Sequence, residues 1–121
     1  MVTKAGKYFS ENGKEKAFAA YQDKAGEFVK GELYVFVYDF NGICLAHGSK
    51  PKLVGANRLD VEDVNGKKYI REMIEGAKTK VSGWVDYMFV NPETKAIEPK
   101  SSYYSRLGSN DMMVCCGIYK K

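Results

Sequence analysis

An α+β domain, with a five-stranded antiparallel sheet and helices packed on one side, is the fold predicted by this sequence of 121 residues. Two observations support it. Five apolar or aromatic stretches are separated by short turn-forming segments, which is typical of antiparallel hairpins. Two other regions carry apolar residues at helical spacing. The length fits one domain spanning residues 1–121.

The strongest strand signal is at residues 33–38, which are all apolar or aromatic, as expected for a strand covered on both faces. Asn41-Gly42 predicts a tight turn, because this pair readily adopts the positive φ angles of hairpins. The chain is then expected to return as a strand over 43–47. Three further strands are predicted, at residues 84–90, 100–107 and 112–119, with turns at 91–94 and 108–111.

Two regions have helical periodicity. Residues 2–22 predict two helical pieces with a break at Asn12-Gly13. From Gly66 onward, an amphipathic helix is predicted by one apolar stripe that comprises Tyr69, Ile70, Met73, Ile74 and Ala77. Between strand and helix, residues 48–64 lack periodicity, and a loop this long in a compact domain is usually functional.

Composition argues against some classes of partner. The net charge is +4, but Lys and Glu alternate and no basic stripe is visible, so nucleic acid is not an expected partner. No apolar stretch reaches the roughly 18 residues of a membrane span, and no signal peptide is recognisable. We expect the start at Met1 to belong to an excised domain, so that contact with a membrane would come only through segments absent from this chain.

No metal or cofactor site is expected. Residues 63–66, Asp-Val-Asn-Gly, partly match a calcium loop, but Val61 occupies the position of the leading carboxylate. We therefore predict a turn there. The three cysteines, Cys44, Cys115 and Cys116, form no Cys-x-x-Cys pattern.

Catalysis is not expected either. His47 is the only histidine, and Cys44 precedes it by three residues on the same predicted strand. In a regular strand this odd offset places the two side chains on opposite faces, which excludes a Cys–His pair. A small thiol enzyme using Cys115-Cys116 is the alternative from another functional class.

A candidate ligand site begins at Lys100, which is followed by Ser101, Ser102, Tyr103 and Tyr104. Charge and hydroxyl groups together suit a carboxylate. An edge strand with exposed polar groups explains the same residues equally well. In the preceding strand, Trp84 and Tyr87 are expected to face opposite sides of the sheet.

Several phrases, taken in order and spacing, resemble the single Cache domain family from about Phe9 to the end of the chain. They are Tyr34-Val35-Phe36-Val37-Tyr38-Asp39-Phe40-Asn41-Gly42, Leu45-Ala46-His47-Gly48, Val54-Gly55-Ala56-Asn57, Gly83-Trp84-Val85-Asp86-Tyr87, Asn91-Pro92, Lys100-Ser101-Ser102-Tyr103 and Cys116-Gly117-Ile118-Tyr119. The resemblance implies a PAS-like sheet that binds a small ligand, in a non-enzymatic, extracytoplasmic (periplasmic or extracellular) sensor part of a chemoreceptor or histidine kinase.

The resemblance also implies a set of ligand-contacting positions: His47, Asn57, Trp84, Tyr87, Lys100 and Tyr103. Because the chain is basic and the long loop is placed by resemblance over the sheet, we expect a small anion, most simply a short carboxylate, near Lys100. A homodimer through the N-terminal helix is a further expectation. A stand-alone secreted Cache protein with a structural or interaction role, its pocket filled by side chains, is the alternative.

Overall fold

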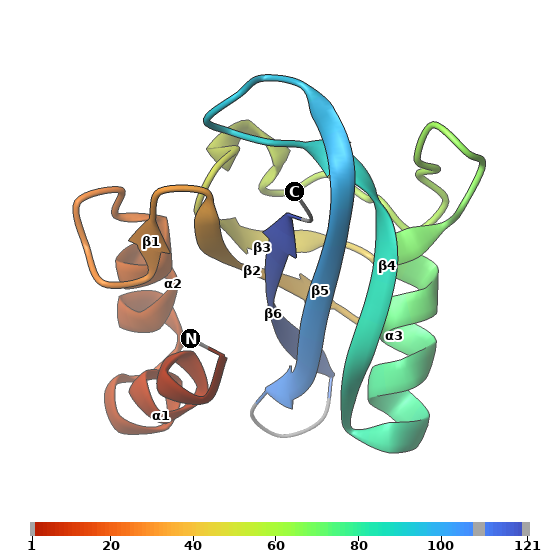
Figure 1. Ribbon diagram of the computed structural model, residues 1–121. Coiled ribbons are helices and arrows are strands. Elements are labelled where there is room, and N and C mark those ends of the chain that lie inside the picture. The colour runs from red at the N-terminus through yellow and green to blue at the C-terminus, as the bar shows by residue number, and fades with distance from the viewer. Residues whose placement is uncertain (1, 108–110, 120–121) are drawn as a thin grey trace.

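The computed structural model describes residues 2–107 and 111–119 (Figure 1). Its helices are α1 (Val2–Asn12), α2 (Lys14–Gln22) and α3 (Tyr69–Lys80), with a 3-10 turn, η1 (Pro51–Leu53). Its strands are β1 (Val29–Lys30), β2 (Leu33–Asp39), β3 (Cys44–His47), β4 (Ser82–Val90), β5 (Ile97–Leu107) and β6 (Met112–Tyr119). None of these helices has the length and apolar character needed to cross a bilayer.

All strand pairs are antiparallel, which confirms the predicted α+β class. Strand β6 lies between β2 and β5, and β4 follows β5. The other side of β2 pairs with β1 near its start and with β3 further along. The sheet therefore contains the five predicted strands and adds the two-residue β1. Most of the predicted turn at 108–111 lies outside the described residues.

The predicted break between the N-terminal helices is confirmed at Gly13, whose φ of 87° separates α1 from α2. A positive φ is costly for residues with a Cβ, so glycine suits this position. The two helices are joined further by Tyr21 of α2, whose hydroxyl donates to the carbonyl oxygen of Ala5 at 2.5 Å.

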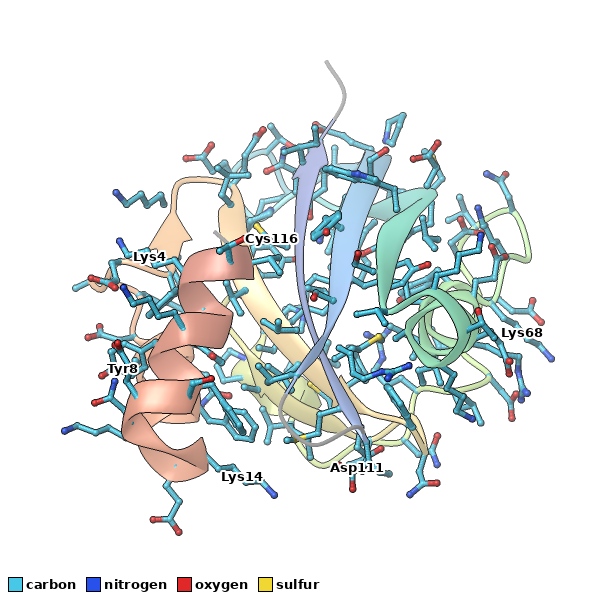
Figure 2. The ribbon with its side chains drawn as sticks, turned by 90° about the horizontal axis from the view of Figure 1, so that it is seen from below. Lys4, Tyr8, Lys14, Lys68, Asp111 and Cys116 are labelled. Carbon is cyan, nitrogen blue, oxygen red and sulfur yellow. The ribbon has the colours of Figure 1, made fainter. Side chains whose placement is uncertain are left out.

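The helices cover both faces of the sheet, so the prediction that they pack on one side is wrong. Helices α1 and α2 lie on one face and α3 on the other (Figure 2). Alternation along β2 explains this arrangement, because Val35 and Val37 face α1 and α2 whereas Tyr34, Phe36 and Tyr38 face α3. A strand that is apolar on both faces requires cover on both.

A β-bulge in β3 overturns the prediction that Cys44 and His47 face opposite ways. Phe36 pairs with His47, but Tyr38 pairs with Cys44, so the register shifts by one residue. The extra residue restores both side chains to the α3 face. Cys44 is buried in the cluster there, and His47 stacks on Phe36 with ring centroids 5.6 Å apart.

Candidate functional site

The centre of the candidate site is Lys100 of β5, whose side chain is only 1% exposed. Its Nζ donates a hydrogen bond to the hydroxyl of Tyr34 at 2.9 Å. Aromatic rings surround the ammonium at 4.4–5.8 Å from their centroids, and they belong to Tyr34, Phe36, Tyr87, Phe89 and Tyr119. Among the described residues no carboxylate forms an ion pair with it. Burial lowers the pKa of Lys100 to about 7.

Gly117 of β6 makes room for this lysine. A Cβ at position 117 would lie 2.3 Å from Cε of Lys100 and 2.4 Å from Oγ of Ser102. Only glycine therefore allows the Lys100 side chain to cross the neighbouring strand at this point. The register, in which Ser102 is paired with Gly117, thus helps to position the ammonium.

His47 forms the next part of the site and is 3% exposed. Its Nδ1 accepts hydrogen bonds from the backbone N–H groups of Ser49 and Lys50, at 3.2 and 2.9 Å. Burial, with the positive charges of Lys100, Arg58 and Lys50, lowers the pKa of His47 to about 3. The ring is therefore neutral near pH 7, and its proton is on Nε2, which can act as a donor.

Arg58 brings the long loop to the site, and sequence reasoning missed it. Its Nη1 donates to the hydroxyl of Tyr38 at 3.1 Å, and its Nη2 donates to that of Tyr69 at 2.9 Å. Tyr69 stacks face to face on Tyr87, with ring centroids 4.3 Å apart. The signal that could have found Arg58 is its place beside Asn57, in a loop already expected to close over the sheet.

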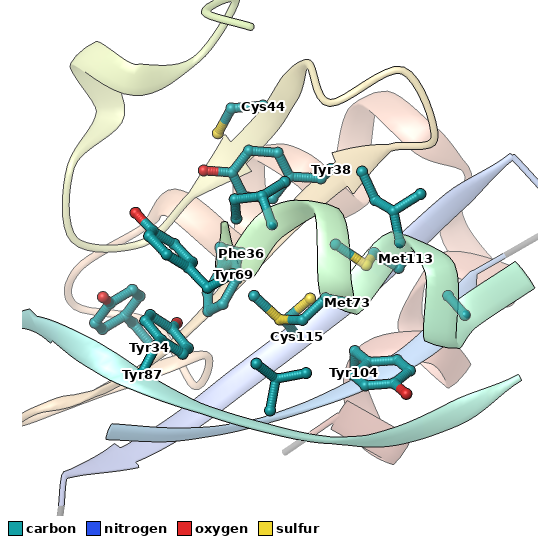
Figure 3. Close-up of a cluster of buried hydrophobic side chains, with 14 residues drawn as sticks. Tyr34, Phe36, Tyr38, Cys44, Tyr69, Met73, Tyr87, Tyr104, Met113 and Cys115 are labelled. Carbon is teal, nitrogen blue, oxygen red and sulfur yellow. The ribbon is translucent and has the colours of Figure 1, made fainter. Parts of the chain in front are cut away.

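These side chains line a small cavity between the sheet, α3 and the loop. Its lining is Tyr34, Phe36, Tyr38, His47, Arg58, Tyr69, Ile70, Tyr87, Phe89 and Lys100. Tyr34 and Tyr87 lie close together at one end of the buried cluster on this face, and Met113 and Tyr104 lie toward the other (Figure 3). The free space is about 10 Å³, enough for roughly one water molecule. The lining is cationic and hydroxyl-rich and contains no carboxylate.

Three of the predicted site residues, His47, Tyr87 and Lys100, come together in this lining. The alternative in which Lys100 begins an exposed edge strand is wrong, because β5 lies between β4 and β6 and Lys100 is buried. Tyr87 is fixed by a 2.9 Å hydrogen bond between its hydroxyl and that of Ser102.

The structure does not bring the other three predicted residues into the cavity. Trp84 and Tyr103 lie on the opposite face, where their rings meet edge to face at 5.2 Å, and Trp84 is 58% exposed. Both are an odd number of residues from an inward-facing partner, Tyr87 or Lys100, so strand alternation turns them away. Asn57 is exposed, and its Oδ1 accepts the backbone N–H of Leu59 within the loop.

The cysteines are poor candidates for nucleophiles. Cys44 and Cys115 are fully buried, and burial raises the pKa of Cys44 to about 11 and that of Cys115 well above its usual value. A thiol that keeps its proton reacts slowly. In the part of the chain described, no cluster of His, Cys, Asp and Glu suitable for a metal occurs.

The calcium-like segment is a turn, as predicted. Oδ1 of Asp63 accepts the backbone N–H groups of Asn65 and Lys67, and its Oδ2 accepts that of Met88 in β4. The carboxylate therefore connects the loop to the outer strand of the sheet.

Comparison with known proteins identifies the family to which the chain belongs. Residues 2–121 match the model of the family described as Single Cache domain 2. Over 86 residues, or 71% of the chain, the sequence is 35% identical to the sensor histidine kinase MctS of Rhizobium johnstonii, and the match spans 18% of that protein's length.

Solved structures share the fold. A methyl-accepting chemotaxis protein from Vibrio parahaemolyticus superposes with a TM-score of 0.80 at 30% identity, covering 98% of this chain and 81% of that one. A Cache chemosensory domain solved to show carboxylic acid recognition gives a TM-score of 0.81 at 21% identity, covering 98% and 83%. With a family model that covers nearly its whole length and a sheet of the same architecture, this chain belongs to the Single Cache domain 2 family of sensory, rather than catalytic, domains.

Proposed function

We propose that this chain is the non-enzymatic, ligand-sensing domain of a bacterial signal-transduction receptor, and that it binds a short carboxylate beside Lys100. The observation that carries the proposal is a buried ammonium with aromatic rings and one hydroxyl around it, but no described carboxylate to balance its charge. A buried charge without a counter-ion is costly. An anionic ligand would supply the missing partner.

The neighbouring groups suit the same ligand. Arg58 offers a planar, bidentate donor, and the Nε2–H of His47 and the hydroxyl of Tyr69 add further donors. A charge-assisted hydrogen bond of this kind contributes roughly 1.5–3 kcal/mol, or about ten- to a hundredfold in affinity. Because the cavity has room for about one water molecule, a bound acid must be small and must displace part of the lining.

The relatives support the wider role. One is a sensor histidine kinase and one a chemotaxis protein, and a domain of the same fold recognises carboxylic acids. Since this chain spans 18% of the kinase, we infer that the output and any membrane anchor belong to other segments. A periplasmic or extracellular location, one functional unit over residues 1–121, and a homodimer through α1 belong to the same proposal.

A thermal-shift screen tests the ligand class. Wild-type protein is heated with acetate, propionate, lactate and pyruvate, with amino acids, and with methylated amines as cationic controls. The short acids are expected to raise the melting temperature in a concentration-dependent way. Stabilisation by amines or neutral solutes, without stabilisation by acids, would overturn the carboxylate proposal.

The closed cavity supports a second candidate, in which the aromatic side chains fill the pocket and the domain has a structural or interaction role. In that case no solute in the screen shifts the melting temperature. Backbone NMR spectra then also stay unchanged on addition of millimolar acid, whereas a sensor shows shifts at Lys100, Arg58 and their neighbours.

A further inference from the structure

A second hollow, which we call the lysine cleft, lies outside the buried cavity. It has a volume of about 520 Å³, and its charged lining consists of Lys24, Lys50, Lys52 and Lys95. No carboxylate is part of this lining, although the carboxylate of Glu93 lies beside the lining residue Gly31, with Oε2 3.3 Å from the position a Cβ would take there. Four lysines against one adjoining carboxylate leave an excess of positive charge at the cleft.

The lysine cleft and the buried cavity share a wall. Tyr34 lines both, and its hydroxyl holds the ammonium of Lys100. The segment after β3 makes a second connection, because the backbone N–H groups of Ser49 and Lys50, in the cleft wall, donate to Nδ1 of His47, in the cavity. The Tyr34 side chain and the backbone of Ser49 and Lys50 thus lie between the lysine cleft and the buried cavity.

Two other hollows also reach the cavity lining, but their charge is unfavourable to an anion. One, of about 280 Å³, includes Lys67 and Lys100, but the carboxylates of Asp63 and Asp86 balance their charge. The other, of about 230 Å³, includes Arg58 and Tyr69 but also Glu62 and Asp63. Charges of one sign in a cleft raise the local concentration and the association rate of ligands of the opposite sign. The carboxylates in the other two hollows oppose such an increase for anionic ligands.

We infer that the lysine cleft is the entrance through which small anions reach the buried site, by displacement of Tyr34 and the segment that follows His47. This inference rests on the proposed carboxylate-sensing function. It assigns the four cleft lysines a role in the rate of capture, while Lys100 holds the captured ion. Long-range electrostatic attraction acts mainly on the association rate, so the dissociation rate is expected to change little.

The test compares variants with equal net charge. Lys52 and Lys95 are exposed, and neither has a side-chain hydrogen bond or ion pair among the described residues, so K52Q/K95Q is expected to fold normally. The matched control is K14Q/K16Q at the start of α2, away from the cleft. The variant E62Q removes a negative charge from the hollow of about 230 Å³ beside Arg58, which is an alternative entrance.

Association and dissociation rates are measured by NMR line-shape titration with each acid of the series acetate, propionate, lactate and pyruvate that stabilises the wild type. At low ionic strength, K52Q/K95Q is expected to lower the association rate about two- to fivefold relative to K14Q/K16Q, and the difference should vanish at high salt. Equal rates for the two double variants, or faster association in E62Q than in the charge-matched E15Q at the start of α2, would overturn the entrance proposal while leaving the carboxylate function intact.

Two other outcomes separate the inference from the function on which it rests. If acids shift only signals of the lysine cleft, and K100M still binds them, the cleft is itself the binding site and not an entrance. If no acid binds the wild type at all, the proposed function and the entrance fail together.

Discussion

The two faces of the sheet bury side chains of different character. Toward α1 and α2, strand β2 presents Val35 and Val37, and the buried cluster there has no charged member. Toward α3 and the long loop, the same strand presents tyrosine and phenylalanine, and the buried set includes Lys100 and His47. One strand thus serves a dry face and a polar face by simple alternation.

This difference suggests that the face covered by α1 and α2 serves stability, whereas the face covered by α3 serves binding. On the dry face the helices bury apolar side chains, and the buried Tyr21 hydroxyl has a hydrogen-bond partner, so this cluster contributes to stability. The polar face retains a cation whose charge is unfavourable when buried. Such a group is expected to persist for binding at the expense of stability.

The largest effect is expected on the dry face. Phe28 is fully buried, and its ring packs edge to face on Tyr21 at 5.0 Å. The variant F28A should lower the free energy of unfolding by about 3–5 kcal/mol, because it leaves a cavity in a packed cluster. Urea denaturation measures this loss. Acid affinity per folded molecule should stay at the wild-type value; a parallel loss of affinity would show that the two faces are coupled.

On the polar face, the matched change is expected to act in the opposite direction. The variant K100M keeps an unbranched side chain of similar length but removes the ammonium. It should raise the free energy of unfolding by roughly 1–4 kcal/mol near pH 6, since a buried charge is replaced by an apolar group. The same variant should lose about ten- to a hundredfold in acid affinity by calorimetry. A less stable K100M would refute the idea that Lys100 is retained at a cost.

The pH dependence of stability sharpens the contrast. Folded Lys100 releases its proton near pH 7, whereas in the unfolded chain it does so near pH 10.5. Between these values the unfolded state binds more protons, so the free energy of unfolding should rise with pH, by at most about 1.4 kcal/mol per unit. Measurements from pH 7 to 8 stay below the usual thiol pKa of about 8.5, above which cysteine ionisation in the unfolded chain acts in the opposite direction. The rise should be absent in K100M.

Acid affinity should move the other way over the same pH range. A bound carboxylate favours the protonated ammonium, so its affinity should fall by up to about tenfold per pH unit above pH 7. An affinity independent of pH from 6 to 9 would mean that Lys100 does not contact the acid.

The smallest effect concerns Trp84, which the resemblance placed among the ligand contacts. Because its side chain is 58% exposed on the face away from the cavity, W84A should change stability by no more than about 0.5 kcal/mol. Acid affinity should be unchanged. A tenfold loss of affinity would indicate that a ligand or a second copy of the chain uses the dry face.

The candidate site could be predicted only in part from the sequence. Lys100, His47 and Tyr87 were selected by residue type and resemblance, and the structure brings them together. Tyr34, Tyr38 and Tyr69 read as ordinary core residues, because an inward-facing tyrosine in a strand or helix has the same pattern whether its hydroxyl meets a ligand or a neighbour. Arg58 was hidden in a loop without periodicity.

By itself, the sequence determined the features that depend on neighbouring residues. Alternation and turn residues fixed the strands, Gly13 ended the first helix, and the heavy apolar content of residues 33–38 required cover on both faces. Tertiary structure alone decided what depends on contacts distant in the sequence. The bulge in β3 turned Cys44 to the side of His47, the pairing of Ser102 with Gly117 opened space for Lys100, and the loop carried Arg58 to Tyr69. These outcomes follow from register and packing between strands, which no local pattern encodes.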